Sequence, residues 1–190
     1  MEACRRTRVA VVCRIIDKGD QNMSKPFVSI LMGSDSDLPV MEASFDILRK
    51  FDIPFEVKVT SAHRTPEATH NFVTDADARG CAAFICAAGM AAHLAGAVSA
   101  TTLKPVIGVP INGSLDGLDA LLSTVQMPGG IPVATVAIGK AGAKNAAYLA
   151  AQIIGVSDPE MHQKLIAERA ANAAAIIAKD AALQEKLKNS

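Results

Sequence analysis

Short apolar runs alternate with longer segments of helical periodicity from Phe27 onward. Runs of about six apolar residues bounded by turn residues are typical of buried strands, whereas apolar positions three or four apart indicate helices. The pattern predicts five strands, at Phe27–Met32, Pro54–Thr60, Ala82–Ala87, Pro105–Val109 and Val133–Ile138. It also predicts five intervening or following helices, at Leu38–Phe51, Pro66–Arg79, Ala91–Thr102, Leu115–Val125 and Ala141–Ile154.

Strands and helices that alternate in this way form right-handed βαβ units, whose parallel sheet is covered on both faces. We therefore expect an α/β fold, a flavodoxin-like three-layer αβα sandwich with a five-stranded parallel sheet. No internal repeat or low-complexity linker interrupts the pattern, so a single domain is expected over residues 26–190.

A long C-terminal helix is expected over residues 158–188. Ser157-Asp158-Pro159-Glu160 has the S-x-x-E form of a capping box that opens a helix. The helix carries a series of apolar residues, Leu165, Ile166, Ile176, Ile177, Leu183 and Leu187. Two arrangements would bury them and stay open at this point: packing on a neighbouring subunit, or folding back on the same domain.

Residues 1–25 form an N-terminal extension unlike the rest of the chain. Its apolar stretch is short, Arg14 interrupts it and no small-residue cleavage site follows, so a processed signal peptide is disfavoured. We expect the extension to be poorly ordered. We also hypothesise that residues 1–22 are not native, because Lys18-Gly19-Asp20 can be encoded by a purine-rich string like a ribosome-binding sequence just before Met23.

Composition narrows the function classes. Lys+Arg and Asp+Glu both number 19, so the chain lacks the basic excess that nucleic acids or membrane surfaces attract. Aromatic residues make up only 4%, which argues against base-stacking platforms. No apolar run approaches the ~18 residues of a membrane span. The four cysteines form no CxxC motif, so buried free thiols in a reducing cytoplasm are expected.

Polar residues follow the first two predicted strands, where ligands of open parallel sheets bind. Gly33-Ser34-Asp35-Ser36-Asp37 could cradle a phosphate through Ser34 and bind a ribose hydroxyl through Asp37. The alternative is that Ser36 or Asp37 only caps the next helix.

The second strand leads into Ser61-Ala62-His63-Arg64-Thr65-Pro66. Ser61 and Arg64 suit a phosphate, and His63 is the candidate acid/base, with a structural surface histidine as the alternative.

The third strand leads into a loop of small residues that includes Ala88 and Gly89, which permits close approach of a ligand to the backbone. We interpret His93, within the first turns of the next predicted helix, as structural or supporting rather than catalytic. Walker A, G-x-G-x-x-G and G-x-S-x-G motifs are absent, and the histidines lack metal-ligand partners in sequence. The residues indicate a nucleotide-phosphate site without a metal or a cofactor motif.

Five ordered motifs resemble those of the N5-carboxyaminoimidazole ribonucleotide mutases, the PurE family of purine biosynthesis. They are Gly33–Asp37, Ser61–Pro66, Ala91–Leu94, Val125–Val133 and Ala137–Gly142, and the resemblance runs from about Phe27 to the tail helix. It implies a flavodoxin-like homo-octamer with active sites at subunit junctions, and a reaction that needs no metal, ATP or organic cofactor. It leaves open whether the N5-CAIR synthetase that makes the unstable substrate hands it over directly.

The resemblance also implies roles for single residues. His63 would protonate N5 of the substrate as the carbamate breaks, and would later take the C4 proton, so that the carboxylate moves from N5 to C4. The implied substrate-binding residues are Ser34, Ser61 and Arg64 for the 5′-phosphate, Asp37 for the ribose, and Ala88, Gly89, His93 and Leu94 elsewhere in the site. The chain departs from the family pattern at Ala87, Met90 and Ala95, where Gly, Gly and Pro are common.

Three alternatives remain open. A related aminoimidazole ribonucleotide carboxylase would use free CO2, but that branch is expected to carry Lys at the position of Arg64 and a different segment around residues 126–132. A non-catalytic nucleotide-binding module would have no need of His63. A purely structural oligomer is disfavoured by polar clusters at three successive strand ends.

Overall fold

The computed structural model describes residues 14–15 and 25–189. The expectations for the N-terminal extension, including a native start at Met23, therefore lie outside the described residues, apart from Arg14, Ile15 and Lys25. Arg14–Ile15 form β1, a two-residue strand that pairs antiparallel with β3 (Phe55–Val59).

The described strands form one sheet in the order β1-β3-β2-β4-β5-β6. The five strands after β1 are parallel in the flavodoxin-like order, which confirms the predicted fold class. These are β2 (Phe27–Met32), β3, β4 (Cys81–Ala88), β5 (Val106–Pro110) and β6 (Ala134–Thr135). β1 was not predicted, and β6 is much shorter than the predicted strand at residues 133–138.

The short β6 reflects how its chain enters the next helix. Val136 still donates a backbone hydrogen bond to Gly108, beyond the end of the regular strand. The helix that follows begins at Gly139, two residues earlier than predicted. A Cβ atom on Gly142 would collide with the carbonyl of Ala137, so only glycine allows the helix to start this close to the strand.

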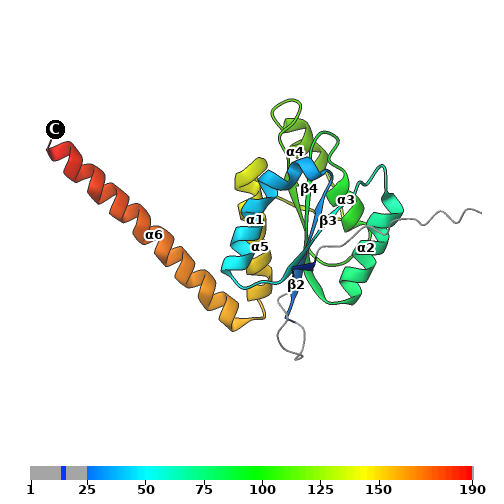
Figure 1. The fold of residues 1–190 in the computed structure, drawn as a ribbon, viewed down its shortest axis with the longest axis horizontal. Helices are drawn as coiled ribbons and strands as arrows, with labels where there is room; N and C mark the ends of the chain where they lie inside the picture. The colour runs from blue at the N-terminus through cyan, green and yellow to red at the C-terminus, as the bar shows by residue number, and fades with distance from the viewer. Residues whose placement is uncertain (1–13, 16–24, 190) are drawn as a thin grey trace, which may run out of the picture.

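Helices cover both faces of the sheet (Figure 1). α1 (Leu38–Lys50), which follows the short helix η1 (Asp35–Asp37), lies beside α5 (Gly139–Gly155) on one face. α2 (Pro66–Ala78) and α3 (Leu94–Ser99) lie on the other face, and α4 (Leu118–Val125) contacts β5 and β6. Predicted helix boundaries agree closely for α1 and α2, whereas α3 and α4 begin three residues later than predicted.

The core is divided by the sheet into two apolar clusters. Because side chains alternate along a strand, Val28, Ile30 and Met32 of β2 pack towards α1 and α5, and Leu31 packs towards α2 and α3. In β4, Cys86 belongs to the second cluster, and burial raises the pKa of its thiol. Cys81 and Cys86 are buried and free, as predicted; Cys4 and Cys13 lie outside the described residues.

A polar network is buried near the amino ends of β2 and β3. Glu56 on β3 is only 3% exposed, and it accepts hydrogen bonds from Ser29 of β2 at 2.7 Å and from the Arg79 guanidinium at 2.7 and 2.9 Å. Arg79 also pairs with Asp75 at 2.7 Å and stacks over Phe27. The network ties the end of α2 to two strands.

The last helix, α6 (Pro159–Lys188), leaves the sandwich and extends far beyond it (Figure 1). The prediction that Ser157 caps this helix is wrong. Asp158 is the cap, because its carboxylate accepts hydrogen bonds from the backbone N–H groups of Glu160 and Met161. Folding back on the same domain is also not observed. The helix is roughly 45 Å long at 1.5 Å per residue, and its apolar residues from Ile176 onward are exposed.

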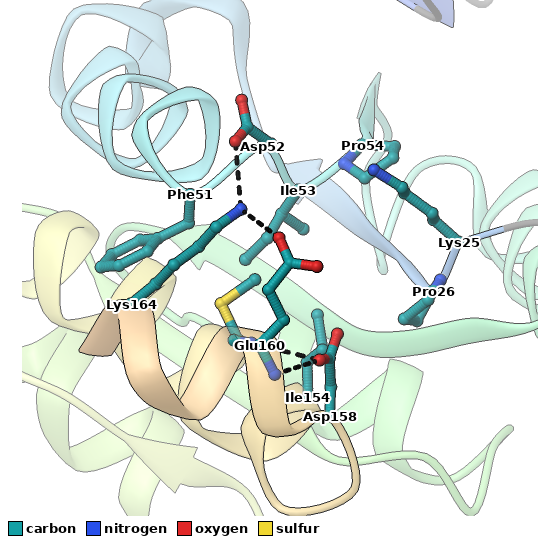
Figure 2. A pocket seen from close by; sticks show the side chains of 11 residues that line it. Lys25, Pro26, Phe51, Asp52, Ile53, Pro54, Ile154, Asp158, Glu160 and Lys164 are labelled. Atoms are coloured by element: carbon teal, nitrogen blue, oxygen red, sulfur yellow. Dashed lines mark hydrogen bonds and ion pairs between the residues drawn. The ribbon is translucent and has the colours of Figure 1, made fainter. Parts of the chain in front are cut away.

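Only the first turns of α6 contact the domain. Met161 is buried, and the ammonium group of Lys164 lies between the carboxylates of Asp52 and Glu160, at 3.2 and 3.1 Å (Figure 2). One turn further on, Glu168 pairs with Lys50 at 2.6 Å and accepts a hydrogen bond from Tyr148. From Arg169 onward every described residue of the helix is exposed.

Arg79→Ala is expected to lower the free energy of unfolding by about 2–3 kcal/mol, because it leaves the buried Glu56 carboxylate without its cation. Asp46→Ala is the matched control, since it breaks an exposed ion pair with Arg49 and should cost less than about 1 kcal/mol. Urea unfolding of both variants measures the difference. Equal effects of the two substitutions would contradict the assigned role of the network.

Candidate active site

An open cavity of about 680 Å³ lies at the carboxyl ends of the parallel strands. Loops after β2, β3, β4 and β5 form its walls. Every residue predicted for the site lines it, namely Ser34, Asp37, Ser61, His63, Arg64, Ala88, Gly89, His93 and Leu94. The structure therefore brings together residues from three separate parts of the sequence at the switch point of the sheet.

Backbone hydrogen bonds join the loops just beyond the strands. Thr60 donates to Met32, Gly33 donates to Ala87, and Ile111 donates to Ala88, each at 2.9 Å. These bonds continue the sheet's ladder by one residue at each strand end. They hold the four loops in fixed positions relative to one another.

The loop after β2 has a structural task of its own. Ser34 caps η1, since its hydroxyl accepts from the N–H of Ser36 at 3.2 Å, and Asp37 Oδ2 accepts from the N–H of Ser34 at 3.1 Å. Ser34 is thus the cap of η1, with Asp37 reciprocating. Asp37 occupies the N-cap position of α1, as one alternative expected, but its side chain makes no capping hydrogen bond there, and Ser36 is not the cap. Both still line the cavity, so capping and ligand binding are compatible here.

The loop after β3 is held by hydrogen bonds to its own residues. The Thr65 hydroxyl accepts a hydrogen bond from the N–H of Ser61 at 3.0 Å, and the N–H of Thr65 donates to the Ser61 carbonyl at 2.9 Å. The Ser61 hydroxyl accepts from the N–H of Arg64 at 3.1 Å. The exposed Arg64 guanidinium makes no ion pair with any residue in the described part of the chain. A preformed turn therefore presents a free cation and a hydroxyl to the cavity.

His63 contacts His93 across the cavity wall. Nε2 of His63 lies 3.1 Å from Nδ1 of His93, and the two rings meet edge to face at 89°. One of these nitrogens must donate and the other accept, so the contact restricts both the orientation and the tautomer of His63. His93 does not lie inside a helix as predicted, but immediately before Leu94, the first residue of α3.

Burial raises the pKa of Asp37, and the nearby Asp35 raises it further. The hydrogen bond from Ser34 opposes this effect in part. Asp37 is 7% exposed and lines the cavity, where its carboxylate can accept a hydrogen bond from a ligand hydroxyl.

Sequence reasoning assigned no role to the residues after β5. Ile111, Asn112 and Gly113 line the cavity, as do Ser36, Ala62, Met90 and Ala91. The same strand-end rule that identified the earlier loops applies to Asn112-Gly113-Ser114, which was recognised only as a turn. No group of three metal-ligating side chains occurs within residues 14–15 and 25–189. Over the same residues, no helix is long and apolar enough to cross a membrane.

The fold and the site together define a class of protein: a flavodoxin-like α/β protein whose switch-point cavity is lined by serines, an exposed arginine and an exposed histidine. The chain belongs to the AIR carboxylase family, which matches residues 27–188, and this confirms the resemblance drawn from its motifs.

Similar proteins agree with this assignment. The N5-carboxyaminoimidazole ribonucleotide mutase of Mycobacterium tuberculosis is 52% identical over 161 residues, covering 84% of this chain and 91% of that protein. The phosphoribosylaminoimidazole carboxylase of Ogataea methanolica is 58% identical over 137 residues, covering 72% of this chain but 25% of that protein. The crystal structure of Treponema denticola PurE gives a TM-score of 0.77 at 33% identity, covering 84% of this chain and 99% of that one.

The raised pKa of Asp37 predicts a pH-dependent contribution to stability. Because the folded protein binds this proton more tightly than the unfolded chain, the wild type should gain stability relative to Asp37→Asn as the pH falls through the raised pKa towards the ordinary aspartate range. Urea unfolding of both proteins at several pH values measures this difference. A difference that is independent of pH, or of opposite sign, would show that burial does not dominate at Asp37.

Proposed function

We propose that this chain is an N5-carboxyaminoimidazole ribonucleotide mutase, an isomerase that moves a carboxylate from N5 to C4 of aminoimidazole ribonucleotide in purine biosynthesis. The observation that carries the proposal is the position of His63, between a phosphate cradle and a loop of small residues in one open cavity. Family membership and the names of the relatives support the same reaction.

The polar end of the cavity would hold the nucleotide. Ser34, Ser61 and the unpaired Arg64 guanidinium are suited to the 5′-phosphate, since a guanidinium can donate two hydrogen bonds to its oxygens. Asp37 would accept from a ribose hydroxyl. Binding energy from these groups would position the imidazole ring against His63 and the 88–94 loop, which includes Ala88, Gly89, His93 and Leu94.

Proton transfer by His63 then accounts for the reaction. The N5–carboxylate bond breaks, its electron pair goes to N5, and protonated His63 donates a proton there, which leaves CO2 and aminoimidazole ribonucleotide. C4 attacks the CO2 carbon and forms the new bond. Neutral His63 takes the C4 proton and is restored to its starting state. His93 would act as a positioning residue, because its contact at 3.1 Å fixes the His63 ring.

His63→Asn should lower kcat/KM for conversion of N5-carboxyaminoimidazole ribonucleotide by about 10²–10⁴-fold, with nucleotide binding retained. The assay contains neither ATP nor bicarbonate and follows the C4-carboxylated product. His70→Asn is the matched control, since His70 is exposed on α2 and does not line the cavity. Wild-type protein that binds the nucleotide but never converts it would leave a binding module and refute the proposal.

Direct carboxylation is the second candidate function, because one relative carries the name of a carboxylase. Such an enzyme would join free CO2 to C4 of aminoimidazole ribonucleotide. The same assay distinguishes the two reactions: turnover only with aminoimidazole ribonucleotide and high CO2 would assign the carboxylase.

The proposal extends to assembly and location. The protein would be a homo-octamer in the cytoplasm and would receive its substrate from N5-CAIR synthetase. Assembly into an octamer would bury apolar surfaces that are exposed in the single chain. One lies on α6, and a second on and around α4 includes Leu115, Leu118, Leu122 and Val125, which are 46–74% exposed. A closed assembly larger than a dimer requires at least two different contact patches on each subunit, and these two surfaces would supply them.

Replacing Ile176 and Leu183 together by Glu should dissociate the assembly, because the two residues share one exposed face of α6. Ala178→Glu, on the opposite face of the helix, is the control and should leave the assembly intact. Light scattering after size exclusion gives the mass of each. An unchanged mass for the double variant would show that this face of α6 is not an interface.

A further inference from the structure

Met90 has an unusual backbone conformation for a residue with a long side chain. Its φ is +56°, in the left-handed region that favours glycine. The carbonyl of Met90 accepts a hydrogen bond from Ala92, and the next carbonyl accepts from His93, so two tight turns follow directly. The loop thus retains a bulky side chain at a position where a glycine would be free of strain.

The Met90 side chain lies against the neighbouring loop. Met90 belongs to the loop after β4, and its Cγ lies within 4.0 Å of the position that a Cβ on Gly113 would take, in the loop after β5. Both residues line the cavity, and Met90 is 64% exposed. A flexible, apolar side chain therefore lies, largely exposed, on the part of the cavity lining formed after the neighbouring strands β4 and β5.

The cavity lining is polar on one side and largely apolar on the other. The loops after β2 and β3 supply serines, Asp37 and Arg64, whereas β4 and the loops after β4 and β5 supply Ala88, Gly89, Met90 and Ile111, with His93 and Asn112 as polar neighbours. In the proposed reaction the transient CO2 is uncharged and apolar. The side chains of Ala88 and Ile111 make no hydrogen bond to it, and a side chain that covers this apolar part would also exclude water.

From this geometry, and resting on the proposed function, we infer that Met90 closes over the apolar part of the cavity and retains CO2 between its release from N5 and its capture by C4. If CO2 escapes, the N5–carboxylate bond has still broken, N5 has taken its proton from His63, and aminoimidazole ribonucleotide is released. His63 then regains a proton from solvent. Met90 would therefore determine how often the carboxylate is transferred rather than lost.

The test uses substrate labelled with ¹³C in the carboxylate, with unlabelled bicarbonate and carbonic anhydrase in the buffer to dilute any CO2 that escapes. For each protein, the label retained in the product and the aminoimidazole ribonucleotide released are measured, corrected for decay without enzyme. Met90→Ala and Met90→Gly should both lose label and release several-fold more aminoimidazole ribonucleotide per product formed. Met90→Leu should behave like the wild type.

The substitutions to Ala and Gly separate the effect of losing the Met90 side chain from the effect of relieving its backbone strain. Ala keeps the strain of the left-handed conformation and Gly relieves it, so only Gly should raise the melting temperature, whereas both should release CO2. Leu103→Ala, outside the cavity and outside both proposed assembly surfaces, is the control for removal of an exposed apolar side chain.

Unchanged label retention in both small variants would overturn the inference, and so would a lower kcat with unchanged retention, which would make Met90 a positioning residue only. A change in assembly mass that accompanies the loss of label would also overturn it, by making Met90 a contact between copies. Failure of the wild type to convert the substrate would instead refute the proposed function.

Discussion

The site depends on the alignment of four parallel strands at one edge of the sheet. Three backbone hydrogen bonds are made by residues immediately past the strands. Gly33 donates to Ala87, Thr60 donates to Met32, and Ile111 donates to Ala88. Each therefore fixes the first residue of a loop to the neighbouring strand end. This shared edge brings residues separated by up to about 80 positions in the sequence into one cavity.

Most of the architecture could be predicted from the sequence because it follows from local periodicity. β2 was predicted at its observed bounds, since an apolar run ends abruptly at Gly33. β6 was not, because the apolar residues around Ala134 and Thr135 indicate a longer strand, while the collision that Gly142 avoids with Ala137 is a tertiary constraint. Likewise, no periodicity could predict β1, which exists only through its pairing with β3.

The candidate site could be predicted to a similar extent. Residues that follow strands converge by topology alone, so Ser34, Ser61 and His63 were identifiable without coordinates. The contact between His63 and His93 was not, because the two residues are 30 positions apart and meet only through the packing of two loops. The ion pair between Arg79 and the buried Glu56 could not be predicted either, because Arg79 follows α2 and Glu56 lies on β3. Long-range side-chain pairs are set by packing, which a single sequence does not display.

The exposure of the cavity and the exposure of the apolar residues on and around α4 have a common physical consequence. In the proposed reaction, transfer of CO2 requires that water be excluded, yet His63 and Arg64 are exposed in the single chain. The Met90 side chain, inferred to cover the apolar part of the cavity, would leave the polar end open. Closure at that end must come from the ligand itself, from movement of the 61–66 loop, or from a second copy. The exposed residues of α4 follow the 111–117 segment that begins in the cavity wall, so an interface built on them would lie beside the site. Assembly and water exclusion would then be parts of one requirement, because the surface proposed to recruit a second copy adjoins the cavity that the proposed reaction needs closed.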